Sequence, residues 1–191
     1  MLTKDEIITI FQKTEAMLTG HFKLTSGLHS DRYFQCAMIL QHPDHTGVLC
    51  GELARRFAGE NISVVVGPAM GGIIVSYEVA HALGVRSIFT EREEGVMKLR
   101  RGFFITPGEK VLVVEDVITT GGSVLEVIDL IRMLGGEVVG AGVLVDRSNG
   151  KIELGVRTEA LLTTEVLSYS PDECPLCRQG LAVVKPGSRN I

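Results

Sequence analysis

Val111-Leu-Val-Val-Glu-Asp-Val-Ile-Thr-Thr-Gly-Gly-Ser123 lies near the middle of this chain of 191 residues. Its first four residues are apolar and predict a buried strand. Two carboxylates follow, at Glu115 and Asp116, and a loop of threonine and glycine then leads into a helix predicted over 123–134. A strand, a glycine loop and a helix in this order are typical of α/β proteins, in which ligands bind at the carboxyl ends of the strands.

The same order recurs on both sides of this stretch. Short runs rich in β-branched residues predict further buried strands, with a loop or a helix between them. Because strands alternate with helices, we expect a parallel sheet covered by helices on both faces. Ligand chemistry should then lie just after Val66, Thr90, Val114 and Val145. The predicted strands cover 62–66, 86–90, 111–114 and 138–145, and the predicted helices cover 3–18, 43–58, 73–83 and 123–134.

The N-terminal helix is predicted from its capping pattern. Thr3 can cap the helix and Glu6 follows three residues later, while Phe11 and Leu18 fall on one apolar face. The segment 22–39 is predicted to be irregular, with extended pieces. No internal repeat or linker divides the chain, so we expect a single domain over 1–191.

Composition and charge exclude several classes of protein. Hydrophobic residues make up 45% of the chain and charged residues 22%, which excludes a mainly disordered state. The net charge of −4 argues against a general nucleic-acid-binding protein. The longest uncharged run, 61–77, contains Pro68 and several glycines and does not predict a membrane span. The first residues include Asp5 and Glu6 and no basic segment, so we expect a cytoplasmic protein with reduced cysteines.

The central stretch, 111–123, contains the residues best suited to bind a ligand. Backbone N–H groups and hydroxyls at the start of a helix bind phosphate, helped by the helix dipole, and glycines let the backbone approach closely. The carboxylates of Glu115 and Asp116 can accept hydrogen bonds from the hydroxyls of a ribose beside that phosphate. Two other nucleotide-binding folds are disfavoured, because the chain has no P-loop motif and the glycines at 140–142 lack the Rossmann spacing. The stretch therefore predicts a sugar-phosphate site.

The stretch 111–123 resembles the phosphoribosyl diphosphate (PRPP) signature of the type I phosphoribosyltransferases, and the order of loops is similar over roughly 20–170. The segments 20–30, 33–34 and 146–147 are similar to those of the members that use orotate. The resemblance implies the α/β fold of that family: a central parallel sheet flanked by helices, with a small N-terminal hood and a mobile active-site loop. The hood would comprise about 1–40 plus the C-terminal segment, and the core about 45–170.

The resemblance also implies an activity. In those members the phosphoribosyl group passes from PRPP to orotate, giving orotidine 5′-monophosphate and diphosphate in de novo pyrimidine (UMP) biosynthesis. It further implies Mg²⁺ bound mainly through PRPP, with no metal held by the protein alone, and a homodimer with shared active sites. Two alternatives stay open: a type I phosphoribosyltransferase for a purine base, and a PRPP-sensing regulator without catalysis. The hood and Arg147 discriminate between the bases, and a regulator would need a nucleic-acid-binding surface.

Roles of individual residues follow from the resemblance as well. Thr119, Arg147, Tyr33 and Phe34 would contact orotate, whose carboxylate suits the fork of an arginine side chain. The carboxylates in the central stretch would bind the ribose hydroxyls, and the loop after them would hold the 5′-phosphate. The residues implied to bind PRPP are Glu115, Asp116, Val117, Ile118, Thr119, Thr120, Gly121, Gly122 and Ser123.

The charged segment 91–102 would form the loop that closes over the site. Arg92 and Lys98 in this segment are candidate catalytic residues together with Asp116, because the leaving diphosphate needs positive charge. The histidine usual in the family's loop is absent here. Two lysines of the family are also replaced, by Thr25 in the hood and by Gly71 in the predicted diphosphate loop.

Cys174-Pro-Leu-Cys177 is a CxxC motif near the C-terminus. It offers two thiolate ligands, whereas structural zinc takes four. Inert thiols are therefore the favoured interpretation, with a zinc site and a redox pair as alternatives. The five histidines are scattered along the chain, and His29, in the predicted hood, is the one most worth examining.

Overall fold

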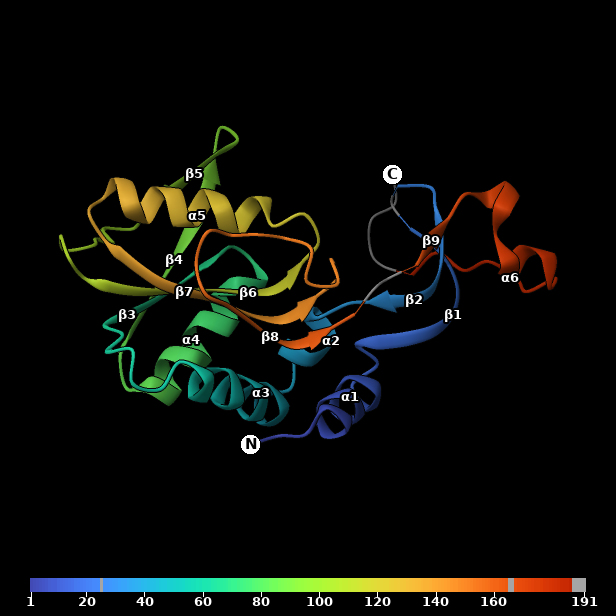
Figure 1. The fold of residues 1–191 in the computed structure, drawn as a ribbon, viewed down its shortest axis with the longest axis horizontal. Coiled ribbons are helices and arrows are strands. Elements are labelled where there is room, and N and C mark those ends of the chain that lie inside the picture. The colour runs from blue at the N-terminus through green and yellow to red at the C-terminus, as the bar shows by residue number, and fades with distance from the viewer. Residues whose placement is uncertain (25, 165–166, 187–191) are drawn as a thin grey trace.

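The computed structural model describes residues 1–24, 26–164 and 167–186. Within these ranges the larger part is a six-stranded sheet with five parallel strands and one antiparallel edge strand (Figure 1). The predicted central parallel sheet is therefore confirmed. In their spatial order the strands are β5 (Val96–Leu99), β4 (Arg86–Glu93), β3 (Val64–Pro68), β6 (Lys110–Ile118), β7 (Glu137–Asp146) and β8 (Thr158–Thr163).

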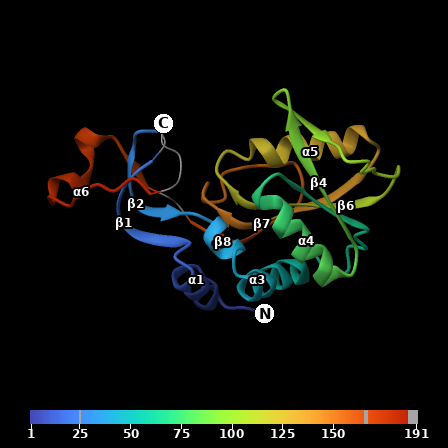
Figure 2. The ribbon, with the colours of Figure 1, turned by 180° about the vertical axis from the view of Figure 1, so that it is seen from behind.

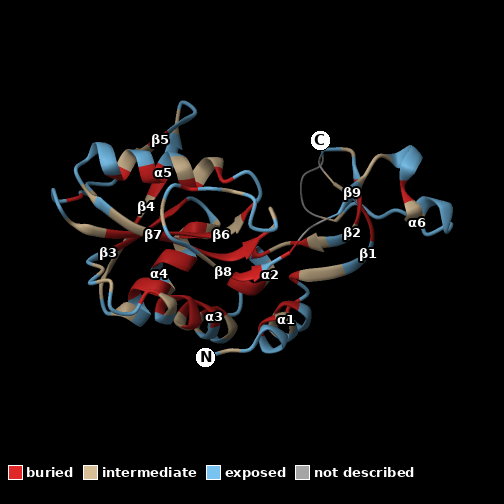
Figure 3. Cartoon of the chain, in the orientation of Figure 1, coloured by how far each residue is buried: buried red, intermediate tan, exposed pale blue. Residues whose placement is uncertain are grey.

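Helices cover both faces of this sheet. α3 (Pro43–Arg56) and α4 (Gly71–Leu83) lie on one face and α5 (Gly122–Met133) on the other (Figures 1 and 2). Side chains alternate along each strand, so Val65 joins the core under α3 and α4 while Val64 joins the core under α5. Each fully buried apolar side chain of this kind contributes about 1.5–3 kcal/mol. Burial is accordingly concentrated in the strands and in the inner faces of the helices (Figure 3).

A second, antiparallel sheet lies beside the first (Figure 1). Its middle strand, β2 (His29–Phe34), pairs with both β1 (Met17–Lys23) and β9 (Ser168–Tyr169), so the C-terminal segment returns to the N-terminal one. We use the name hood for 1–40 together with 167–186. Its short helices are α2 (Ala37–Leu40), η1 (Pro171–Glu173) and α6 (Pro175–Arg178).

The N-terminal helix is shorter than predicted. The capping box of Thr3 and Glu6 is present, and Phe11 is fully buried as expected. However, α1 (Lys4–Lys13) ends before Glu15, whose φ of 55° turns the chain out of the helix. Leu18 consequently belongs to β1 and not to the apolar face of the helix. None of the helices in the described part of the chain is long and apolar enough to cross a membrane.

Two strands, β6 and β4, continue several residues beyond their predicted ends. β6 continues through Ile118, so the carboxylates of the central stretch are part of the strand and not of the loop after it. β4 continues to Glu93 and turns into β5, so the expected loop over 91–102 begins as a β-hairpin. Its turn residues, Glu94 and Gly95, have φ values of 52° and 82°, as a two-residue hairpin with the usual strand twist requires.

Candidate active site at the carboxyl end of the sheet

Two adjacent carboxylates lie near the end of β6. Glu115 is 9% exposed, and one of its oxygens, Oε1, accepts a hydrogen bond from the N–H of Asp116 at 3.1 Å. Asp116 Oδ1 accepts one from the N–H of Val117 at 2.9 Å. Burial, reinforced by the charge of Asp116, raises the pKa of Glu115, and burial raises the pKa of Asp116 as well. Negative charge is therefore costly at this pair, and hydroxyl donors or a cation would lower that cost.

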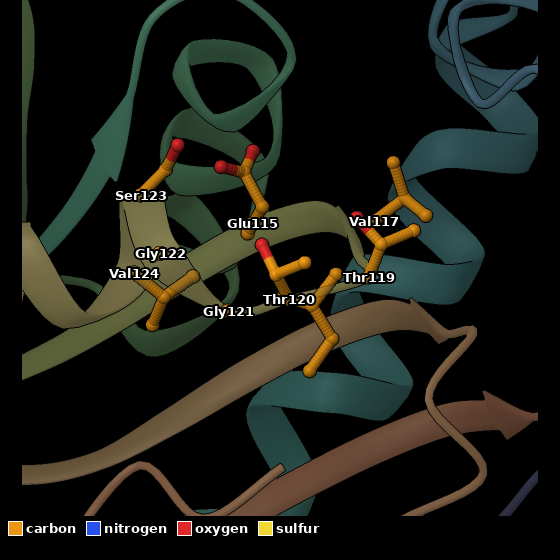
Figure 4. A pocket seen from close by; sticks show the side chains of 9 residues that line it. Glu115, Val117, Thr119, Thr120, Gly121, Gly122, Ser123 and Val124 are labelled. Carbon is orange, nitrogen blue, oxygen red and sulfur yellow. The ribbon is translucent and has the colours of Figure 1, made fainter. Parts of the chain in front are cut away.

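The loop after β6 forms a pocket at the start of α5. Gly121 precedes the helix with a φ of 74°, and a Cβ there would lie 2.8 Å from Ile152 Cγ2. Gly121 provides no side-chain cap for this helix end, and the first residues of α5, whose N–H groups have no partner within the helix, line the pocket. Figure 4 shows the side-chain oxygens of Ser123 and Thr120 on the same side of the ribbon as the Glu115 carboxylate. The pocket is lined by Glu115, Val117, Ile118, Thr119, Thr120, Gly121, Gly122, Ser123 and Val124.

A second glycine-rich loop faces the carboxylates from the end of β3. A Cβ at Gly71 would lie 2.5 Å from Asp116 Oδ2, and one at Gly72 would lie 3.1 Å from Glu115 Oε1. The backbone of this loop therefore approaches the carboxylates so closely that a side chain at position 71 would require the Asp116 carboxylate to move. The sequence analysis did not predict this contact. The run of glycines after a buried strand is the sequence feature that could have indicated it.

Arg147 lies just beyond the end of β7. Asp146 holds the following loop, because Oδ1 accepts from the N–H of Ser148 at 2.7 Å and Oδ2 from the N–H of Gly150 at 2.9 Å. The N–H of Arg147 donates to the carbonyl of Ile118 at 2.9 Å, which ties this loop to the end of β6. Its guanidinium Nε is buried and has no hydrogen-bond partner among the described residues. Burial also lowers the pKa of Arg147. Buried donors nearly always have an acceptor, so this arginine is placed to receive an anion.

The two aromatic residues predicted for the base side of the pocket point in different directions. Tyr33 is half-buried, and a negative charge on its side chain would raise the pKa of Arg147. The two side chains are therefore near each other. Phe34 is 7% exposed and packs edge-on against Phe11 with ring centroids 6.5 Å apart. Neighbouring residues of a strand alternate between its faces. Phe34 therefore belongs to the hydrophobic core, and we retain only Tyr33 for base binding.

The β4–β5 hairpin holds Arg92 and Lys98. Arg92 pairs across the hairpin with Met97 and reaches Glu126 of α5 at 2.7 Å. Lys98 pairs with Glu91 on the opposite face and donates to Glu93 at 2.7 Å. The two predicted clamp residues thus lie on opposite faces of one hairpin, and each is engaged by a carboxylate. The replaced hood lysine at position 25 falls outside the described residues.

A scan of family models matches the phosphoribosyl transferase domain over 37–155. This range contains the sheet strands β3 to β7, both glycine loops and the paired carboxylates. The fold and the site are therefore those of a phosphoribosyltransferase.

Comparison with similar proteins shows which family of phosphoribosyltransferases the chain resembles. The orotate phosphoribosyltransferases of Pelotomaculum thermopropionicum and Desulforamulus reducens are 73% and 70% identical over 190 residues, covering 100% of both chains in each comparison. The crystal structure of orotate phosphoribosyltransferase from Aeropyrum pernix superposes with a TM-score of 0.70 at 29% identity, covering 82% of this chain and 93% of that one. The chain belongs to the orotate phosphoribosyltransferase family.

Proposed function

We infer that this chain transfers the phosphoribosyl group of PRPP to orotate, giving orotidine 5′-monophosphate and diphosphate in pyrimidine biosynthesis. The observation that carries the choice of base is Arg147, whose buried Nε has no partner among the described residues. Orotate has a carboxylate that a guanidinium fork can bind with two hydrogen bonds, whereas the common purine bases have none. The curated relatives with full-length matches support the same base.

The reaction breaks the bond between C1 of the ribose and the diphosphate oxygen, and forms a bond from C1 to a ring nitrogen of orotate. Positive charge grows on the ribose while negative charge grows on the leaving group. We assign the ribose hydroxyls to Glu115 and Asp116, a buried pair of carboxyl groups near the end of β6 whose pKa values are raised. The loop 117–123 and the start of α5 would hold the 5′-phosphate, and Thr119, Arg147 and Tyr33 would orient orotate. Positioning and preset charge are sufficient, and no covalent nucleophile is required.

Mg²⁺ fits this site. Its oxygen ligands would be the ribose hydroxyls and diphosphate of PRPP, and the buried carboxylate pair, whose pKa values are raised, favours a cation nearby. When bound, the ion would supply positive charge to the leaving diphosphate. The residues of this chain would bind the ribose of PRPP, and the ion would be bound to PRPP.

We also propose that the β4–β5 hairpin completes the active site of a second copy in a homodimer. The hairpin lies at the edge of the sheet (Figure 1). Lys98 is on the face of the hairpin opposite to Arg92, which reaches Glu126 of α5. Lys98 would release Glu93 and bind the diphosphate in the neighbouring site. None of the four cysteines, all of which lie in the described part of the chain, forms a disulfide, which supports a reducing compartment such as the cytoplasm.

An absorbance assay tests the function. The purified chain is incubated with PRPP, Mg²⁺ and orotate, and orotate consumption is compared with diphosphate release. We expect equal amounts of both, with no consumption of adenine, guanine, hypoxanthine or xanthine. Turnover of a purine base instead of orotate would contradict the assignment of Arg147. Binding of PRPP without turnover of any base would favour the non-catalytic regulator.

A further inference from the structure

The hood contains a cluster of four side chains that the proposed reaction does not use. His21 comes from β1, His29 from the start of β2, and Cys174 and Cys177 flank the start of α6. One nitrogen or sulfur atom from each residue lies within 4.8 Å of the three others. His21, His29 and Cys174 are buried, at 4%, 6% and 0% exposed. Two distant parts of the chain thus place two imidazoles and two thiols at a single point.

The separations suit a tetrahedral metal site. Zinc bonds of about 2.3 Å to sulfur and 2.0–2.1 Å to nitrogen place neighbouring ligand atoms about 3.3–3.8 Å apart. His21 Nε2 lies 3.5 Å from Cys174 Sγ and 3.7 Å from Cys177 Sγ. His29 Nδ1 lies 3.3 Å from Cys177 Sγ and 2.9 Å from His21 Nε2. Small movements of these side chains would bring all four atoms to zinc-bonding distance.

The surrounding backbone orients the ligands. His21 lies in the irregular step of β1 between Thr19 and Phe22, and its ring packs edge-on against the ring of His29, with centroids 4.8 Å apart. The Nδ1 atom of His21 is 2.7 Å from the carbonyl oxygen of Leu181. As the donor in that hydrogen bond, Nδ1 carries the proton and leaves the lone pair of Nε2 directed at the cluster. A hydrogen bond of this kind to the non-ligating nitrogen is a usual feature of zinc-bound histidines.

We propose that His21, His29, Cys174 and Cys177 bind a structural Zn²⁺ ion. Two thiolates and two imidazoles form the donor set that favours zinc, and because all four ligands come from the protein the site is closed to substrate. On binding, the thiols release their protons to solvent. The expectation that the CxxC motif holds inert thiols is thereby replaced. The sequence offered two ligands, and the fold supplies the other two from the hood hairpin.

The zinc would fasten the C-terminal segment to the strand pair β1–β2. Among the described residues, two backbone contacts also join that segment to the strand pair: β9 pairs with β2 over two residues, and Val184 exchanges backbone hydrogen bonds with His21 and Lys23. β2 also carries Tyr33, which we assign to orotate. The metal would therefore stabilise the hood and, through it, the base side of the active site, without taking part in the chemistry.

Metal analysis of the purified full-length chain tests this proposal. After dialysis without chelator we expect about one zinc ion per chain. Replacing zinc with Co²⁺ should give the visible absorption of a tetrahedral cobalt site together with thiolate-to-cobalt charge transfer. A wild-type chain that retains no zinc and gives no such spectrum with Co²⁺ would overturn the proposal, as would recovery of Cys174 and Cys177 as a disulfide.

Variants identify the ligands. Cys177→Ser, at the exposed ligand, and His21→Ala should each lower the zinc content and weaken the cobalt spectrum. Cys50→Ala and His81→Ala, which lie outside the cluster, should keep both at the wild-type value. Unchanged zinc in the ligand variants would overturn the assignment. Circular dichroism shows whether each variant is folded.

Proteolysis of the wild-type chain provides a measurement that needs no variant. Arg178 is an exposed trypsin site next to the cluster. Adding a zinc chelator should speed cleavage after Arg178 severalfold, while cleavage within the larger sheet stays slow, and added Zn²⁺ should reverse the effect. Equal cleavage rates with and without chelator would show that no metal fastens this segment. These readouts do not depend on catalysis, so they separate the failure of this proposal from the failure of the proposed function.

Discussion

Gly71 and Asp116 approach each other so closely that a Cβ at position 71 would lie 2.5 Å from the Asp116 carboxylate oxygen. The resemblance to the type I family implies a lysine in this loop, and from the sequence alone its replacement by Gly71 predicts a lost contact with the diphosphate. The structure gives a different explanation. The backbone at Gly71 lies against the Asp116 carboxylate, in the space that a side chain would need.

Adding a side chain at Gly71 should therefore lower the activity of the enzyme. We expect Gly71→Ala and Gly71→Lys to lower kcat/KM for PRPP by roughly tenfold or more, because overpacking a close contact costs about 1–3 kcal/mol. Gly51→Ala is the matched control, since Gly51 is helical and a Cβ there meets nothing within 4 Å. Steady-state kinetics with varied PRPP measures the effect. A gain in activity for Gly71→Lys would show that the loop opens to accept the side chain.

Glu115→Gln should make the substrate-free protein more stable and the enzyme less active. Burial and the charge of Asp116 raise the pKa of Glu115 to about 9 in the folded chain, against about 4.3 for an ordinary glutamate. Between these values the folded chain binds more protons than the unfolded chain, so the free energy of unfolding falls as the pH rises. Below both values the group makes no difference, and above both the loss is complete.

Chemical denaturation between pH 5 and pH 9 checks this expectation. Wild type should lose stability across the range more steeply than Glu115→Gln, and PRPP should bind the variant more weakly at every pH. Glu137→Gln serves as the control, because Glu137 is exposed at the start of β7. Parallel pH profiles for wild type and Glu115→Gln would contradict the raised pKa.

Arg147→Ala should impair orotate binding and leave PRPP binding nearly unchanged. A hydrogen bond to a charged group contributes about 1.5–3 kcal/mol, so we expect kcat/KM for orotate to fall by roughly ten- to a hundredfold. Arg147→Lys should recover little, because an ammonium group cannot form the paired fork with a carboxylate. Arg132→Ala, at an exposed arginine in the last turn of α5, is the control. An equal loss of PRPP affinity would move Arg147 to the phosphate site.

Mixing inactive variants tests whether Lys98 acts in the neighbouring subunit. Lys98→Ala and Arg147→Ala should each be nearly inactive as homodimers. In a hybrid, the site with intact Arg147 receives Lys98 from the partner chain, so refolding equal amounts together should restore roughly a quarter of the wild-type activity. Lys98 acting within its own chain predicts no recovery. Mixing Arg92→Ala with Arg147→Ala shows by the same reasoning whether Arg92 acts in its own subunit or in the neighbouring one.

Local patterns were sufficient for much of the fold. Apolar runs with β-branched residues predicted four of the parallel strands, because such runs are stable only when buried, and Thr3 with Glu6 marked the first helix by its cap. The central stretch predicted the phosphate loop for the same reason: the strand, the glycine turn and the helix start are neighbours in sequence, so their geometry is local. Phe34 shows the limit of this reasoning, because its strand face depends on pairing with distant residues.

The sequence by itself determined the class of fold, the carboxylate pair and the helix start to which we assign the 5′-phosphate, since each depends on residues a few positions apart. Only the tertiary structure decided that Arg92 and Lys98 lie on opposite faces of a hairpin and that Gly71 touches Asp116. It also brought the CxxC motif to His21 and His29. These relationships depend on strand register and on contacts between segments that are distant in the sequence. Because side chains alternate between the two faces of a strand, a register shift of one residue moves each side chain to the opposite face.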